Sequence, residues 1–169
     1  IEAIVHTDLR ALRRIFGLLR RLMPAYGFDT IYQEIRGMVM SELDYRLEAA
    51  AIERIAANFK KRDSKLPVRF PRVIHELSRE RVLTTEWISG TKIADIPAIV
   101  GAGMDRRQTA RTCVQAYCEQ IFIDGEYHAD PHPGNLLVQR TTDNDRTPTI
   151  VFLDFGATAQ VSESMRRGM

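Results

Sequence analysis

The sequence has no long apolar run, few cysteines and little net charge, and each absence limits what the protein can be. No stretch reaches the roughly 18 consecutive apolar residues of a membrane-spanning helix, so none is expected within the chain. The only cysteines, Cys113 and Cys118, lie in an apparent helix, and no signal peptide is visible, so we expect reduced core thiols in an intracellular protein. A formal net charge of +2 gives no argument for nucleic acid as a partner.

The sequence also lacks an initiating Met, because it begins at Ile1, and nothing marks Met169 as a natural end. We therefore expect it to be part of a longer protein. Its 169 residues suffice for one domain or two small lobes. A hydrophobic content of 44% and a charged content of 27% are typical of a soluble globular protein.

Helical periodicity dominates the first third of the sequence. Apolar residues recur every three or four positions over residues 4–23, and Pro24 ends that segment. Thr30 and Gln33 fit a capping box, after which the periodicity continues to about residue 59, as one long helix or as two with a bend. The first helix carries five arginines with no acidic residue among them: Arg10, Arg13, Arg14, Arg20 and Arg21.

The middle of the sequence changes from helical to strand-like patterns. Residues 68–73 and 81–88 are rich in β-formers and predict strands. Ser89-Gly90, Pro97, Gly101 and Gly103 indicate loops over residues 89–103. Residues 105–123 are helical again.

The most informative segment reads His-Ala-Asp-Pro-His-Pro-Gly-Asn over residues 128–135, and Asp154-Phe155-Gly156 follows later. An Asp, an Asn five residues on and an Asp that opens D-F-G are the residues with which a kinase holds a phosphoryl donor and its metal. Neither a glycine-rich phosphate loop nor a V-A-I-K lysine precedes them in the sequence. The chain is therefore expected to hold half of a nucleotide site.

A predicted hairpin brings the two motifs together. Residues 136–139 and 150–153 are short apolar runs around a polar turn, which indicates an antiparallel pair. Asn135 begins the first strand and Asp154 follows the second, so the two residues are expected to be neighbours. Their oxygens suit Mg²⁺, which favours hard oxygen ligands, and Asp130 is placed to accept a hydroxyl proton or to orient a water.

Two other interpretations of these residues are open. Asp and Asn are common in turns because they bond their own backbone, so either motif alone is compatible with a structural role. His128, Asp130 and His132 offer an alternative zinc site, but Pro131 and Pro133 exclude the helix that would align the histidines. We expect His128 to be a structural residue that bonds to backbone.

Four segments resemble the UbiB-type (AarF-like) atypical kinase family, and they occur in the family's order. Residues 41–50 are similar to its E-x-D-Y-x-x-E-A signature, and residues 81–90 look like its inter-lobe segment. Residues 124–138 are close to its catalytic-loop motif, and residues 153–157 match its metal-binding motif.

The resemblance implies an α+β, protein-kinase-like fold with a partial N-lobe and a helical C-lobe that holds the catalytic hairpin. Residues 1–88 would contain family-specific helices, helix C and the remaining N-lobe strands. Residues 89–169 would begin the C-lobe. Asp130 would take the catalytic-loop position, and Asn135 and Asp154 would be metal ligands.

The resemblance also assigns roles outside the catalytic loop. Glu48 would be the helix-C glutamate that pairs with the nucleotide-binding lysine, although Asp44 and Glu48 taken alone fit an ordinary solvated helix face. Glu42 and Asp44 would contact a segment with a K-x-G-Q motif, which covers the protein-substrate site, and His128 belongs to the same family signature. The backbone that would meet adenine belongs to Glu86, Trp87 and Ile88.

The family is associated with ubiquinone and other isoprenoid-lipid metabolism. The resemblance therefore implies an ATPase or phosphotransferase that uses ATP or ADP with Mg²⁺. Besides the nucleotide, the implied partners are quinone-precursor lipids or quinone-biosynthesis proteins. It also implies a protein that lies on or is anchored in a membrane, of a bacterial cell or an organelle, through parts outside this chain.

The family's K-x-G-Q segment, alanine-rich loop and nucleotide lysine are expected before Ile1. Without that lysine, Glu48 is expected to have no partner in this chain, which alone should bind ATP weakly or not at all and be inactive. Two alternatives are open. Small-molecule phosphotransferases of the aminoglycoside or choline kinase type share the H-x-D-x-x-x-x-N loop, and the basic helix over 4–23 suits a non-catalytic, membrane-associated pseudokinase scaffold.

Overall fold

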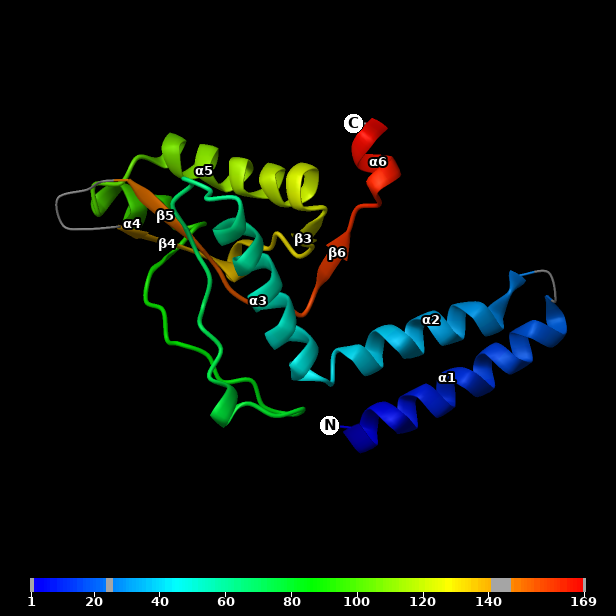
Figure 1. Ribbon diagram of the computed structural model, residues 1–169. Coiled ribbons are helices and arrows are strands. Elements are labelled where there is room, and N and C mark those ends of the chain that lie inside the picture. The colour runs from blue at the N-terminus through cyan, green and yellow to red at the C-terminus, as the bar shows by residue number, and fades with distance from the viewer. Residues whose placement is uncertain (1, 24–25, 141–146, 169) are drawn as a thin grey trace. The chain divides into compact units, whose positions relative to one another are not determined.

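The computed structural model describes residues 2–23, 26–140 and 147–168, which form two compact units divided between Tyr45 and Arg46. Figure 1 shows their helices and strands. The predicted polar turn at 141–145 lies outside the described residues. Within the described part of the chain, no helix is both long and apolar enough to cross a membrane.

The first unit is a pair of helices that lie side by side, α1 (Glu2–Leu22) and α2 (Phe28–Ser41). Phe16 of α1 packs on Phe28 at the start of α2, with ring centroids 5.8 Å apart. The helix predicted over residues 4–23 is confirmed. Apolar side chains of the two helices thus bury one another, as amphipathic helices require.

The second predicted helical stretch is divided, because α3 (Tyr45–Lys61) begins a new helix after a turn. The predicted capping box is wrong. Gly27, with φ 58°, stands at the N-cap of α2 without a side-chain cap, and Thr30 lies within the helix, where its N–H donates to the Gly27 carbonyl at 3.0 Å. Glycine reaches this left-handed conformation at little cost, so the helix starts earlier than Thr30 and Gln33 suggest.

The second unit continues from α3 through short strands and helices. They are β1 (Val68–Arg69), η2 (His75–Leu77), β2 (Thr91–Lys92), α4 (Ile96–Gly101), α5 (Arg106–Cys118), η3 (Glu119–Asp124), β3 (Glu126–His128), η4 (Pro133–Asn135), β4 (Leu136–Arg140), β5 (Pro148–Phe152), β6 (Thr158–Gln160) and α6 (Glu163–Gly168).

The strands form two sheets, and the larger has the order β1-β5-β4-β2. Strands β4 and β5 pair antiparallel from Leu136↔Phe152 to Arg140↔Pro148, so the predicted hairpin is confirmed. Strand β1 runs parallel to β5, and β2 runs antiparallel to β4. The smaller sheet pairs β3 with β6, antiparallel.

The predicted strands over 68–73 and 81–88 are mostly absent as regular strands. Only β1 pairs in the sheet, and the rest of these runs forms the isolated bridges Val73↔Thr85 and Arg79↔Val82. Pro71 has no N–H to donate to a ladder, which explains why the first run stops pairing after two residues.

One of the two predictions between residues 89 and 124 needs correction. Pro97 and Gly101 do not mark a loop but belong to α4, whose N-cap residue Asp95 accepts the Ala98 N–H at 3.0 Å. Proline is well tolerated there because the first helical N–H groups have no partner within the helix. The helix predicted over 105–123 is confirmed, but its last turn, η3, is π-helical.

The hydrophobic core lies between α3, the larger sheet and α5. Ile52, Ile55 and Phe59 form the buried face of α3. Phe152 ends β5 and Phe155 follows it, and both are buried completely or nearly so. These side chains belong to one buried cluster, so α3 and the D-F-G segment share one core. Each buried side chain of this size stabilises the fold by about 1.5–3 kcal/mol.

Candidate active site

The loop from Asp130 to Asn135 is tied together by its own side chains. The Asn135 Nδ2 donates to Asp130 Oδ2 at 2.7 Å, and the His132 N–H donates to Asp130 Oδ1 at 3.3 Å. The Gly134 N–H donates to His132 Nδ1 at 3.0 Å, and a Cβ on Gly134 would lie only 2.9 Å from that nitrogen. A side chain at 134 would therefore displace the His132 ring from its bond to the Gly134 N–H.

The β4–β5 hairpin brings Asp154 to the same loop. The Leu153 N–H donates to the Asn135 carbonyl at 2.8 Å, one residue beyond the last pair of the ladder. Asp154 then turns into a left-handed conformation with φ 38°, and its Oδ1 accepts the Gly156 N–H at 3.1 Å. A non-glycine residue in this region of φ is uncommon and occurs often at functional sites.

His128 holds the backbone of the D-F-G segment. Its side chain is fully buried, and Nε2 lies 2.7 Å from the Asp154 carbonyl and 3.1 Å from that of Leu153. Carbonyls only accept, so Nε2 carries the proton and Nδ1 is the acceptor for the Tyr117 hydroxyl at 3.4 Å. Burial raises the pKa of Tyr117, which keeps that hydroxyl a donor. The prediction that His128 bonds to backbone is confirmed.

The zinc alternative has no support in this geometry. His128 bonds to protein groups through both ring nitrogens, and His132 Nδ1 accepts from Gly134. Among the described residues there is no group of three or more His, Cys, Asp and Glu side chains arranged to hold a metal ion.

Gln120 is a buried residue of the site that the sequence did not reveal. It lies in the π-helical turn η3, and its Oε1 accepts the His128 N–H at 2.9 Å. Its Nε2 has no hydrogen-bond partner among the described residues. The sequence offered one signal for this role: the side-chain amide of Gln120 stands beside the apolar run Ile121-Phe122-Ile123, shortly before residue 128. A buried amide in such a place needs a hydrogen-bond partner.

Glu48 reaches the site from α3. Its Oε1 accepts the Phe155 N–H at 3.0 Å, across 107 positions of sequence. The expectation that Glu48 would have no partner in this chain is therefore wrong. A backbone donor supplies one, and the aromatic core beneath Phe155 holds that donor in place.

In the segment from Glu86 to Ile88, the first and last side chains have structural contacts. Glu86 Oε2 accepts the Arg72 N–H at 3.2 Å, and its other oxygen pairs with Arg69. The hydrogen bond from the Arg72 N–H lowers the pKa of Glu86, with help from Arg69 and against the opposing effect of burial. Trp87 is 90% exposed and Ile88 is buried, so Glu86 and Ile88 use their side chains within the fold and Trp87 does not.

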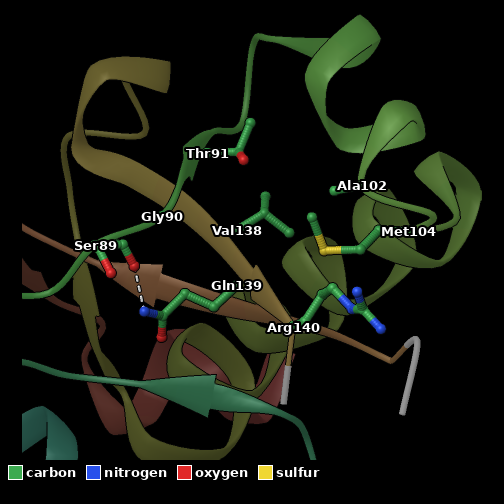
Figure 2. A pocket seen from close by; sticks show the side chains of 8 residues that line it. All are labelled: Ser89, Gly90, Thr91, Ala102, Met104, Val138, Gln139 and Arg140. Atoms are coloured by element: carbon green, nitrogen blue, oxygen red, sulfur yellow. Dashed lines mark hydrogen bonds between the residues drawn. The ribbon is translucent and has the colours of Figure 1, made fainter. Parts of the chain in front are cut away.

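A cavity of about 320 Å³ lies next to this segment, over the end of β4 (Figure 2). Its lining residues are Ser89, Gly90, Thr91, Ala102, Met104, Val138, Gln139 and Arg140. Gln139 Nε2 donates to the Ser89 carbonyl across one side of it. None of Asp130, Asn135 and Asp154 lines this cavity, so it is distinct from the loop of residues 130–135.

The donor set at the loop fits a magnesium ion that also binds phosphate. Asp154 is exposed and offers a carboxylate, and Asn135 directs its amide nitrogen at Asp130, which leaves its carbonyl oxygen as a possible ligand. Two protein oxygens suffice for Mg²⁺, which usually keeps waters or phosphate oxygens as its other ligands. Glu42 and Asp44 belong to the first unit, and their predicted contacts stay predictions.

Comparison with known proteins identifies relatives over the whole sequence. The family described as "ABC1 atypical kinase-like domain" matches residues 1–169. The chain is 36% identical to the chloroplastic protein ACTIVITY OF BC1 COMPLEX KINASE 8 of Arabidopsis thaliana, covering 100% of this chain and 22% of that protein. It is 33% identical to the probable serine/threonine-protein kinase abkD of Dictyostelium discoideum, over 90% of the chain and 21% of the relative. AarF domain-containing kinase 1 of Drosophila melanogaster is 32% identical, over 94% of this chain and 30% of that relative. The chain thus spans less than a third of these relatives' length.

Proposed function

The chain belongs to the ABC1 atypical kinase-like family, and on that premise we propose that it supplies the catalytic loop and the metal-binding segment of an ATP-dependent enzyme, an ATPase or a phosphotransferase. The resemblance to UbiB-type kinases noted in the sequence is confirmed by this membership. Relatives named as kinases support a kinase-like enzyme in general. The nucleotide, the metal and the reaction are the proposal.

One observation carries the proposal: the bonded pair of Asp130 and Asn135 lies at the end of the hairpin that Asp154 follows, where the Leu153 N–H donates to the Asn135 carbonyl. Asn135 and Asp154 would hold Mg²⁺, which neutralises charge that develops on transferring phosphate oxygens. Asp130 would accept the proton of an attacking hydroxyl or orient a water, and its bond to Asn135 holds the carboxylate ready. Phosphoryl transfer needs mainly such positioning and charge neutralisation from a protein.

The supporting residues have roles that follow from their contacts. His128 and Glu48 bond to opposite edges of the peptide group that joins Asp154 to Phe155, at the Asp154 carbonyl and at the Phe155 N–H. They would keep the Asp154 side chain directed at the metal. The backbone of Glu86 to Ile88 would meet adenine, as the family resemblance implies, while the side chains of Glu86 and Ile88 are used within the fold.

The metabolic setting belongs to the proposal as well. We propose a role in ubiquinone or isoprenoid-lipid metabolism, with quinone-precursor lipids or quinone-biosynthesis proteins as partners and a membrane surface as the place of work. The support is the family resemblance alone. One relative is named as a chloroplastic protein, which places that relative in an organelle.

Isothermal titration of Mg-ATP into the natural protein that carries this chain tests the proposal. Asp154→Asn should abolish detectable binding or weaken it at least about tenfold, because the metal loses its charged ligand. Asp63→Asn is the matched control, because Asp63 is also an exposed aspartate with positive φ, at 55°. Wild-type binding that both variants retain unchanged would contradict the proposal.

A further inference from the structure

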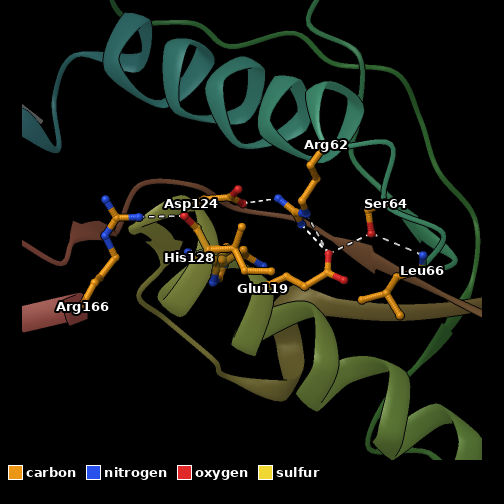
Figure 3. A network of polar contacts seen from close by, with 9 residues as sticks. Arg62, Ser64, Leu66, Glu119, Asp124, His128 and Arg166 are labelled. Carbon is orange, nitrogen blue, oxygen red and sulfur yellow. Dashed lines mark hydrogen bonds and ion pairs between the residues drawn. The ribbon is translucent and has the colours of Figure 1, made fainter. Parts of the chain in front are cut away.

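A group of polar residues fastens the end of α3 to the helical turn before the catalytic loop (Figure 3). Arg62 directs one side of its guanidinium at Glu119 Oε2, with Nη2 at 2.6 Å and Nε at 2.8 Å, and the other side at Asp124. Ser64 Oγ donates to the same Glu119 oxygen at 2.8 Å. We call Arg62, Ser64, Glu119 and Asp124 the Arg62 clasp.

The clasp is largely shielded from solvent. The side chain of Asp124 is 7% exposed and that of Arg62 is 16% exposed. The guanidinium also lies over the ring of Phe59, with its carbon 3.8 Å from the ring centroid. The planar guanidinium of Arg62 is thus held in one orientation by two carboxylates and an aromatic face. A lysine ammonium could not make the same set of contacts.

A second fastening lies two turns back along the same helix. Arg54 donates to Glu126 Oε1 from Nε at 3.0 Å and from Nη2 at 2.8 Å. Glu126 begins β3, the strand that leads to His128 and Asp130. The carboxylates that hold α3 therefore come from η3 and β3, the segments directly before the catalytic loop.

The same helix presents Glu48 to Phe155. Glu48 and Arg62 are separated by 14 positions, roughly 21 Å along a helix at 1.5 Å per residue. Apolar packing by Ile52, Ile55 and Phe59 is non-directional and does not by itself fix how far the helix slides along its axis. Charge-assisted hydrogen bonds in a fork are directional, so they can fix that position.

The electrostatics of Asp124 fit a positional role better than a stabilising one. Burial raises the pKa of Asp124 above its ordinary value, even though Arg62 pairs with it. The ion pair therefore does not fully offset the cost of removing the carboxylate from water. Buried ion pairs of this kind often add little stability, and geometry is then what they contribute.

We propose that Arg62 is a positioning residue: it fixes the axial position of α3 against the catalytic lobe, and so keeps Glu48 on the Phe155 N–H. The catalytic consequence rests on the proposed function, since Glu48 and His128 together orient Asp154. The structural consequence does not rest on it. Helix α3 is then a fixed part of the site, held by Arg62 at one end and by Glu48 at the other.

Hydrogen exchange of the Phe155 amide in the natural protein tests this directly. Arg62→Met and Arg62→Lys are compared with Lys65→Met, a control that removes a nearby cation whose ion pair with Asp63 is exposed. Both Arg62 variants should raise exchange at Phe155 about tenfold, the effect of weakening one hydrogen bond to a charged acceptor, and the control should not. Arg62→Lys keeps the charge, so it gives a result even if Arg62→Met does not fold.

The steady-state constants for Mg-ATP hydrolysis separate positioning from a general loss of stability. A shift in Asp154 should lower kcat more than it raises KM in Arg62→Lys, at a temperature where the variant is fully folded. Phe155 exchange that stays within about twofold of wild type in Arg62→Lys, while amides at the end of α3 speed up, would overturn the proposal. If wild type hydrolyses no ATP, the proposed function fails, and the exchange result still decides the role of Arg62.

Discussion

The carboxylate of Glu48 accepts the backbone N–H of Phe155 at 3.0 Å, which joins helix α3 to the D-F-G segment. Phe155 is 1% exposed, so its ring is fixed in the core while its N–H faces the helix. His128 holds the opposite edge of the same peptide group through the Asp154 carbonyl. The position of Asp154 is thus set by two residues that come from different parts of the sequence.

Glu48→Gln should loosen this turn without removing it. A neutral amide oxygen is the weaker acceptor by about 1 kcal/mol, so exchange of the Phe155 amide should rise several-fold while the chain stays folded. Hydrogen exchange followed by mass spectrometry measures the effect. Glu53→Gln, on an exposed face of the same helix, is the control and should leave Phe155 unchanged.

Phe155→Ala should destabilise the fold strongly. The centroid of its ring lies 6.0 Å from that of Phe70 and 5.0 Å from that of His128. Truncating such a buried aromatic side chain costs about 3–5 kcal/mol of folding free energy. Urea unfolding of the chain measures the loss. Phe122→Ala removes a ring that is 51% exposed and should change the free energy of unfolding far less. Equal losses for the two variants would mean that Phe155 is not part of the core.

Glu86→Gln should remove a pH-dependent contribution to stability. The pKa of Glu86 is lower in the folded chain than its ordinary 4.5, so its ionised form stabilises the fold above that value. This stabilisation is lost as pH falls through the lowered pKa. Unfolding at about pH 7 should therefore show wild type as the more stable protein, and at about pH 3 the difference should shrink. A difference that does not depend on pH would contradict this assignment.

The two cysteines should differ in reactivity. Burial raises the pKa of the Cys113 thiol, which leaves little thiolate at neutral pH. Cys118 is exposed, so the expectation that both are core thiols is wrong for Cys118. A thiol reagent such as iodoacetamide should modify Cys118 about tenfold faster or more, as peptide mass spectrometry would show. Cys118→Ser should eliminate the fast phase, and a fast phase that persists in this variant would contradict the burial of Cys113.

The sequence predicted the hairpin and the residues that converge on it because the determinants are local. Two apolar runs around a polar turn set the pairing of β4 with β5, and this pairing brings Asn135 and Asp154 together. The pairing of Asp130 with Asn135 could be predicted without the rest of the fold, because the two residues lie five positions apart in one short segment.

The contacts that the sequence did not predict depend on distant partners. The bond from Phe155 to Glu48 spans 107 positions, and the pair of Arg62 with Asp124 spans 62. No periodicity encodes such a pairing, because Glu48, Arg62 and Asp124 look like ordinary polar residues in the sequence, and the Phe155 backbone N–H has no sequence signal. The predicted start of α2 was wrong for another reason. The helix begins at the left-handed turn of Gly27, without the side-chain cap that Thr30 and Gln33 suggested.

ATP hydrolysis by the natural protein that carries this chain, with Mg²⁺ present, is the most direct test of the catalytic assignment. Wild type and Asp63→Asn should hydrolyse ATP at the same rate, and Asp154→Asn should lower kcat/KM by at least about a hundredfold, because the metal loses its charged ligand at the end of the hairpin. Unchanged turnover in Asp154→Asn would contradict the account.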